Sequence, residues 1–139
     1  MYSLAEENYL KAVFKLSKGQ TGQVSTNELA AELSTRAASV TDMLKKLAAK
    51  KLISYQRYQG VALTPKGKKV AVATGRKHRL WEFFLHEKLH FGWDEVHEVA
   101  EQLEHINSEL LTDRLEEFLG FPPHDPHGEP IPRKDGSGI

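Results

Sequence analysis

Two short helical segments joined by three or four residues constrain the fold of this chain most. The first, STNELAAEL at 25–33, begins with Ser25 as a helix cap, and Glu28 completes the capping-box pattern. The second, at 36–51, carries Val40, Met43, Leu44 and Leu47 on its inward side and Arg36, Ser39, Thr41, Asp42, Lys45 and Lys46 on its outward side. A short helix followed by a helix with a small, polar first turn and a basic outer face is typical of a helix-turn-helix. We therefore expect the second helix to enter the major groove of DNA.

Two β-like runs follow, at 52–58 and 61–64, on either side of a turn at Gln59-Gly60. A two-stranded hairpin directly after a helix-turn-helix predicts a wing. Arg57 stands near the tip of this wing, where it could lie along phosphate or reach a minor groove. The alternative interpretation is a winged domain that binds another protein.

The formal net charge of zero conceals a strong division of charge along the chain. Residues 1–80 hold 15 Lys and Arg against 5 Asp and Glu, whereas residues 81–139 hold 4 against 14. All seven histidines lie at position 78 or later. The basic part indicates a polyanionic partner, and the acidic, histidine-rich part indicates a sensor.

A long helix is expected from Pro65 to about Leu89, because Thr64-Pro65 forms a helix start and only two glycines interrupt the pattern. Its first part is basic, and its second part is apolar and aromatic. His78 and Glu82 stand four residues apart and hence on one face, which is the spacing of a helical metal clip. An ordinary surface contact between these two side chains is the alternative.

The segment WDEVHEVAEQLEHIN at 93–107 predicts a further helix with four metal-capable side chains on one side. At about 100° per residue, these side chains fall within an arc of about 100°, beside a largely separate apolar arc. They are His97, Glu101, Glu104 and His105. Such an arc can converge on one ion, and because the chain has no cysteine, the ligands must be nitrogen and oxygen atoms. The alternative is a solvated charged stripe with two incidental histidines.

The rest of the chain predicts one more helix and an irregular tail. Ser108 is expected to cap a helix at 109–119, and the Pro- and Gly-rich residues after it form a linker or a docked strap. The predicted fold class is mainly α, with a winged helix-turn-helix at 1–72, an all-helical domain at 73–120 and a tail at 121–139. We see no signal-peptide pattern and no apolar run that could span a membrane, so we expect a cytoplasmic protein.

Six segments, in this order and spacing, resemble the iron- and manganese-dependent bacterial repressors of the DtxR/MntR type. They are ENYLKAVFKL at 7–16, ASVTDMLKKL at 38–47, GVALTPKGKKVA at 60–71, KHRLWEFFL at 77–85, HEVAEQLEH at 97–105 and HGEPIP at 127–132. The resemblance implies a repressor that binds double-stranded operator DNA as a homodimer when a divalent ion is present. It also implies that residues 73–120 form the dimerisation and metal-sensing domain, and that the tail could lead to an SH3-like domain, as in longer relatives.

The resemblance also implies two metal sites. Carried over by position, a primary site would use Asn8, Glu101, Glu104 and His105, and an ancillary site would use His78, Glu82 and His97. Asn8 stands where manganese sensors usually have Asp and iron sensors have Met, and its amide oxygen is a weaker donor to a hard cation than a carboxylate. Lys11 stands where manganese sensors often have a bridging Glu, and its ammonium would repel a second cation. We expect Mn²⁺ or Fe²⁺ as the cofactor, with Zn²⁺, Co²⁺ or Ni²⁺ able to bind in vitro.

The metal is expected to join the first helix to the helix at 97–105 and so to fix the two recognition helices of a dimer at the spacing of successive major grooves. The residues expected to bind phosphate are Lys45, Lys46, Arg57, Lys66 and Lys68. The other candidate DNA-binding residues, several of which could read base edges, are Thr35, Arg36, Ala38, Ser39, Thr41 and Asp42.

Two rival functions remain open on the sequence. Residues 101–105 are similar to the zinc-peptidase motif H-x-x-E-H without its first His, and His97-Glu98 begins an H-E-x-x-H whose last position is Glu101. Both motifs lose a ligand and no hydrolytic nucleophile accompanies them, so we expect no enzyme. The other rival is a metal-independent winged-helix regulator that responds to a different class of ligand.

Overall fold

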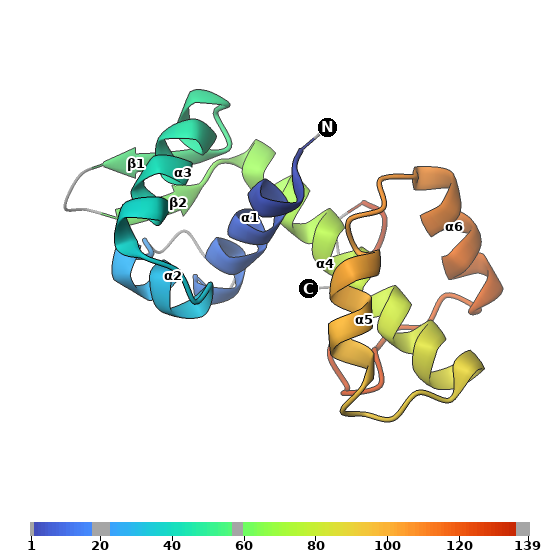
Figure 1. Ribbon diagram of the computed structural model, residues 1–139. Coiled ribbons are helices and arrows are strands. Elements are labelled where there is room, and N and C mark those ends of the chain that lie inside the picture. Colours follow the sequence, from blue (N-terminus) through green and yellow to red (C-terminus); the bar gives the residue numbers. More distant parts are fainter. Residues whose placement is uncertain (1, 18–22, 57–59, 136–139) are drawn as a thin grey trace. The chain divides into compact units, whose positions relative to one another are not determined.

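The computed structural model describes residues 2–17, 23–56 and 60–135, which belong to two compact units (Figure 1). The N-terminal unit comprises Tyr2–Val72, and the C-terminal unit comprises Ala73–Ile139. The described ranges form helices and a two-stranded antiparallel sheet, so the predicted mainly helical class with a small β wing is confirmed. None of the described helices is long and apolar enough to cross a membrane.

The N-terminal unit begins with three helices, α1 (Leu4–Leu16), α2 (Thr26–Glu32) and α3 (Ala37–Ala49). Ser3 and Ser25 start α1 and α2 with complete capping boxes, in which each serine hydroxyl accepts a hydrogen bond from the backbone three residues later. The turn between α2 and α3 spans four residues and reverses through Ser34, whose φ is 52°. A short helix, a tight turn and a second helix therefore form the predicted helix-turn-helix.

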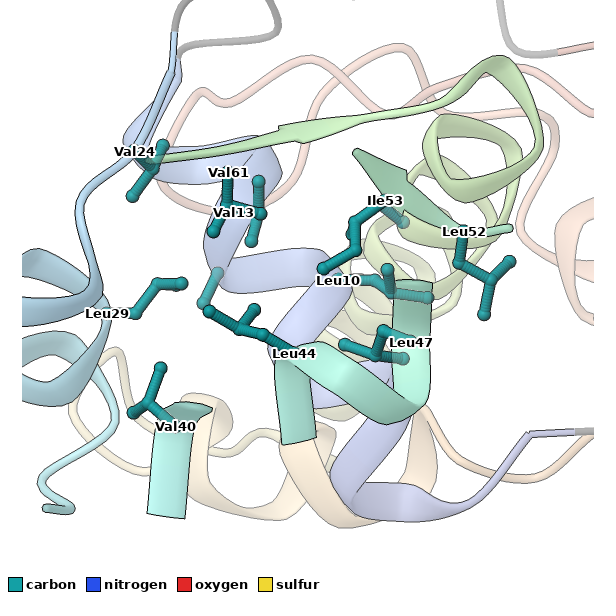
Figure 2. Packing of buried hydrophobic residues seen from close by; sticks show 12 residues of the cluster. Leu10, Val13, Val24, Leu29, Val40, Leu44, Leu47, Leu52, Ile53 and Val61 are labelled. Carbon is teal, nitrogen blue, oxygen red and sulfur yellow. The ribbon is translucent and has the colours of Figure 1, made fainter. Parts of the chain in front are cut away.

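A continuous apolar core holds these helices together (Figure 2). Its fully buried members come from every element of the unit and include Leu10, Val13, Leu29, Val40, Leu44, Leu47, Leu52 and Val61. The inward residues predicted for α3 are buried, except that Met43 is half-buried at the margin of the core. Because α3 packs its apolar side into this core, its opposite side faces solvent.

The wing consists of β1 (Ile53–Gln56) and β2 (Gly60–Leu63), paired from Ile53↔Leu63 to Gln56↔Gly60. Val24, just before α2, extends the sheet by exchanging two backbone hydrogen bonds of 2.8 Å with Val61 of β2. Gly60 has a φ of +96°, and a Cβ there would stand 2.9 Å from the carbonyl oxygen of Val24, so the position requires glycine. The predicted wing-tip residue Arg57 lies outside the described residues.

Helix α4 (Pro65–Leu89) follows the wing and continues into the C-terminal unit. Thr64 caps it, since its hydroxyl accepts a hydrogen bond of 3.1 Å from the backbone N–H of Gly67. A Cβ on Gly67 would stand 1.9 Å from the carbonyl oxygen of Leu52, so glycine allows the first turn of α4 to pack directly on the backbone before the wing.

The C-terminal unit packs α5 (Val96–Leu103) and α6 (Glu109–Phe118) against the second part of α4. Leu80 of α4 contacts Leu115 of α6 and Ile131 of the tail, whereas Leu85 lies against α5. Ser108 caps α6 as predicted, by accepting a hydrogen bond of 3.1 Å from Leu111. The described tail residues fold back as a strap, with a bridge between His124 and Pro130 and a buried Ile131.

One ion pair with a buried carboxylate should make the stability of the N-terminal unit depend on pH. Glu6 is buried and accepts a hydrogen bond of 2.6 Å from Lys50. Burial acts to raise the pKa of Glu6, but hydrogen bonds from Lys50 and Ser3 outweigh it and lower the pKa from 4.5 to about 2. The carboxylate therefore stabilises the fold above pH 4.5, and this contribution is lost as the pH falls from 4.5 to about 2.

We predict that Glu6→Gln lowers the free energy of unfolding by about 2 kcal/mol at pH 7, because a charged hydrogen bond is lost. The difference from wild type should vanish near pH 2, as measured by urea unfolding followed by circular dichroism. Glu32→Gln is the matched control, because Glu32 pairs with a largely exposed Lys15 and should contribute about 0.5 kcal/mol or less. A constant difference between Glu6→Gln and wild type across this pH range would contradict the assignment.

Candidate metal centre

A buried carboxylate, Glu82 of α4, lies at the centre of the C-terminal unit's polar cluster. Its side chain is 4% exposed, and three imidazoles face it. Oε1 lies 3.4 Å from Nε2 of His78, and Oε2 lies 3.8 Å from Nδ1 of His97 and 3.7 Å from Nδ1 of His127. A buried charge is costly unless it is paired or coordinated, so this arrangement indicates a binding function for the cluster.

The buried ring of His78 is held in place from both sides. Its Nδ1 lies 2.9 Å from Oε1 of Glu104, whose side chain is fully buried, and its Nε2 faces Glu82. The His97 ring packs edge-on against the His78 ring at 4.8 Å between centroids. A carboxylate on the far nitrogen of a histidine fixes the tautomer in which the other nitrogen is available to a metal, and Glu104 is placed to do this for His78.

The strap brings two more groups to Glu82, Asp125 and His127. Asp125 is buried, and its Oδ1 accepts hydrogen bonds from the backbone N–H groups of His127 at 2.9 Å and Glu129 at 2.8 Å. These bonds form the tight turn that directs His127 towards Glu82. Sequence reasoning missed Asp125 and placed His127 only within a family motif, although Asp-x-His in a Pro-rich tail was the signal available.

Glu82 and Asp125 form a carboxyl pair whose pKa values are shifted in opposite directions. Burial acts to raise the pKa of Glu82, but the hydrogen bond and charge of His78 outweigh it and lower the pKa. Burial raises the pKa of Asp125, and the neighbouring Glu82 charge raises it further. Asp125 thus favours its protonated form more than a free aspartate does, because it is buried beside the Glu82 charge.

Two overlapping groups of potential metal ligands follow from this geometry, His78–Glu82–His97 and Glu82–Asp125–His127. Within each group, ligand atoms lie within 4.8 Å of one another. The three side chains of the first group are those predicted for the ancillary site. Both groups offer only imidazole nitrogen and carboxylate oxygen, a donor set that suits Mn²⁺, Fe²⁺ and Zn²⁺, so the residues fit the implied ion.

The side chains of the predicted arc at 97–105 contact different partners in the structure. Glu104 caps α5 with helical backbone angles, and its backbone N–H donates to the carbonyl of Ala100 at 2.9 Å. Its carboxylate contacts His78, whereas Glu101 lies 3.4 Å from Nε2 of His97. His105 is half-buried directly after Glu104. Asn8 is half-buried in α1 of the N-terminal unit, and its role as a ligand stays a prediction.

Most of the predicted DNA-binding side chains are exposed on the N-terminal unit. Those at 35, 36, 38, 39, 42, 45, 46, 66 and 68 are exposed, and only Thr41 is half-buried, with its hydroxyl donating to the carbonyl of Ala37 at 3.1 Å. Lys66 lies 3.5 Å from the carbonyl oxygen of Lys50. The exposed face of α3 is therefore free of bulky apolar residues and carries mainly small and basic side chains.

The C-terminal unit also exposes large apolar residues. Leu110 is 65% exposed, Phe118 is 64% exposed and Phe121 is 64% exposed, all on or directly after α6. Exposed apolar residues grouped on one element are typical of a protein interface.

Comparison with known proteins gives two family matches that together cover most of the chain. The family described as iron dependent repressor, N-terminal DNA binding domain, matches residues 1–61, and the one described as iron dependent repressor, metal binding and dimerisation domain, matches residues 64–133. A solved manganese-dependent transcriptional repressor in complex with manganese is 40% identical, with a TM-score of 0.86, over 95% of this chain and 60% of that chain.

Two curated relatives have similar levels of identity. The iron-dependent repressor IdeR of Mycobacterium tuberculosis is 31% identical over 126 residues, which are 91% of this chain and 54% of that protein. The transcriptional regulator MntR of Bacillus pumilus is 32% identical over 117 residues, 83% of this chain and 78% of that protein. The chain thus spans less than two thirds of the length of IdeR and of the solved manganese-dependent repressor.

The contact between Trp93 and the strap provides a test of metal binding. The Trp93 ring meets the His127 ring edge-on at 5.0 Å between centroids. In a Trp81→Phe background, which leaves Trp93 as the only tryptophan, we predict that Co²⁺ quenches the fluorescence because a paramagnetic ion binds beside it. Asp125→Asn should weaken the Co²⁺ affinity about ten-fold or more.

The control for this titration is Asp113→Asn, because Asp113 pairs with Lys134 at the surface and away from the cluster. Its Co²⁺ affinity should equal that of the parent. Equal Co²⁺ affinities for Asp125→Asn and Asp113→Asn would show that the strap takes no part in binding the metal.

Proposed function

Because this chain belongs to the iron-dependent repressor family, we propose that it represses transcription by binding operator DNA as a homodimer when a divalent metal ion is bound. The resemblance to the DtxR/MntR type is thus confirmed, and the activity is our proposal for this chain. The observation that carries it is the Glu82 carboxylate, which is buried among three imidazoles in the unit matched by the metal-binding and dimerisation family.

We propose Mn²⁺ or Fe²⁺ as the physiological ion and Glu82 as its main anionic ligand in the cluster. His78 and His97 complete one ligand group, and Asp125 and His127 complete the other. A bound ion would supply positive charge that compensates the carboxyl groups of Glu82 and Asp125 together. The predicted primary set, Asn8, Glu101, Glu104 and His105, stays part of the proposal on the strength of the family resemblance.

Metal and DNA binding are coupled in this proposal because the ion favours the state of the protein that fits the operator. A ligand shifts an equilibrium only by its difference in affinity for the two states. By reciprocity, operator DNA should raise the affinity for the ion by the same factor as the ion raises the affinity for DNA. The exposed basic residues Lys45, Lys46, Lys66 and Lys68 supply the phosphate contacts, and the undescribed Arg57 belongs to the same predicted set.

We propose no catalytic activity and a cytoplasmic location. The segment HEKLH at 86–90 is an H-E-x-x-H pattern, which requires both histidines on one continuous helix. Here α4 ends at Leu89 and His90 has a φ of 60°, while Nδ1 of His86 is bound to the carbonyl of Phe91 at 3.0 Å. The imidazole rings of His86 and His90 therefore do not lie on one helical face, as the zinc ligands of a peptidase do. A metal-independent regulator is disfavoured because it gives no reason to bury Glu82 among histidines.

The central prediction concerns DNA binding under metal control. Sequences are first selected from a random duplex pool in the presence of Mn²⁺, and fluorescence anisotropy then measures their affinity. We expect tight binding with Mn²⁺, and a loss of about 100-fold when a chelator is added or when Glu104→Ala or His105→Ala is introduced, which corresponds to a coupling of about 3 kcal/mol.

Glu98→Gln serves as the control in this assay, because Glu98 is exposed on α5. It should retain metal-dependent binding. Binding that is indifferent to the chelator would end the proposal in favour of a metal-independent regulator.

A further prediction concerns dimerisation through the exposed residues of α6. Leu110→Glu should convert the protein to a monomer in sedimentation velocity, because a charge would be buried at the interface. Leu4→Glu, at a residue that is 57% exposed on α1, should leave the dimer intact. A dimer that persists in Leu110→Glu at the same concentration would place the interface elsewhere.

A further inference from the structure

Asp42 is an acidic residue in the middle of the basic face of α3. Residues 1–80 contain five acidic side chains, and the other four belong to α1 and α2. Asp42 is exposed, and within the described residues no hydrogen bond or ion pair engages its carboxylate. The nearest charged residues on the same helix are Lys45 and Lys46, three and four positions later. Within the described part of the chain, Asp42 therefore has no fixed side-chain partner.

The geometry of α3 places Asp42 at the centre of the outward face. At about 100° per residue, the buried residues Val40, Leu44 and Leu47 define one direction of the helix, and Asp42 lies within about 15° of the opposite direction. Lys45 and Lys46 lie about 50° to either side of that opposite direction. Ala38, one turn before Asp42, lies on the same central line.

This pattern matches the cross-section of a major groove. A helix in the groove directs its central line to the base edges and its flanks to the phosphates on the two walls. The two lysines are placed for the walls, where their charge is favourable. A carboxylate at the walls would be repelled, so Asp42 has a favourable position only over the bases.

The base edges differ in what they offer to a carboxylate, which only accepts hydrogen bonds. In the major groove, guanine presents two acceptors and thymine presents one, whereas cytosine presents an amino group without an adjacent acceptor. Adenine presents an amino group beside its N7 acceptor, which would repel a carboxylate. We propose that Asp42 reads the exocyclic amino group of a cytosine in each half-site of the operator, an inference that rests on the proposed function.

Neither Thr41 nor Ala38 competes with Asp42 for a hydrogen bond to this base. The hydroxyl of Thr41 is engaged by the carbonyl of Ala37, and Ala38 has only a methyl group. Ala38 lets the helix approach the groove closely without competing for the same base.

Selection from a random duplex pool with Mn²⁺-loaded full chain tests this inference. The wild type should enrich cytosine roughly ten-fold at one symmetric position of each half-site. Asp42→Ala should lose the preference at that position alone. Asp42→Asn should shift it to adenine, because a carboxamide pairs with both the amino group and N7 of adenine.

Glu32→Gln is the matched control, because it removes the same charge from the exposed surface of α2. It should keep the wild-type base preference at every position. If Asp42→Ala enriches the same cytosine as wild type and only binds all sequences more tightly, Asp42 is a repulsive charge and the inference is overturned while the proposed function stands. If wild type enriches no sequence under Mn²⁺ or Fe²⁺, the proposed function fails as well.

Discussion

The C-terminal unit depends on how the charge of Glu82 is compensated. A buried carboxylate loses its hydration, and the loss must be offset by positive charge or by hydrogen bonds. His78 comes from the same helix, His97 comes from α5, and Asp125 and His127 come from the strap. Compensation of the Glu82 charge thus involves α4, α5 and the strap, which are three separate parts of the chain. Burial of Pro122, Ile131 and Pro132 also contributes to the folding back of the Pro- and Gly-rich tail.

The two units are stabilised in different ways. The N-terminal unit is stabilised by a continuous apolar core to which every element contributes. The C-terminal unit has smaller apolar clusters around Leu80 and Leu85, and it buries several charged side chains, among them Arg76, which contacts Glu116 at 2.8 Å. A unit that relies on buried ionisable groups gains stability from any ion that binds its native form. The division of charge along the sequence reflects this division of roles.

Sequence reasoning was most successful where the signal is local. The serine caps at Ser25 and Ser108, the helix start at Pro65 and the helix-turn-helix were predicted, because capping and turn chemistry act within a few residues. Val24 was not predicted to join the wing, since its pairing with Val61 depends on the tertiary fold. Gly67 was seen only as one of two glycines that interrupt the helix pattern, whereas the structure shows the close approach of Leu52 that requires it.

The metal cluster shows the same limit. The pair His78 and Glu82 could be recognised from helical spacing, but the contact of Glu104 with His78 depends on how α5 packs against α4. Asp125 is 43 positions from Glu82, and only the docking of the strap brings them together. No periodicity in the sequence reports such a contact.

Anomalous X-ray diffraction from crystals grown with Mn²⁺ tests the central claim most directly. Data collected at the manganese absorption edge should show a peak within coordinating distance of a Glu82 carboxylate oxygen, at about 2.0–2.6 Å, with imidazole nitrogen from at least one of the facing histidines. Crystals that contain manganese elsewhere and no peak at Glu82 would show that the cluster is a buried ion-pair network, and the metal centre described for this chain would be wrong.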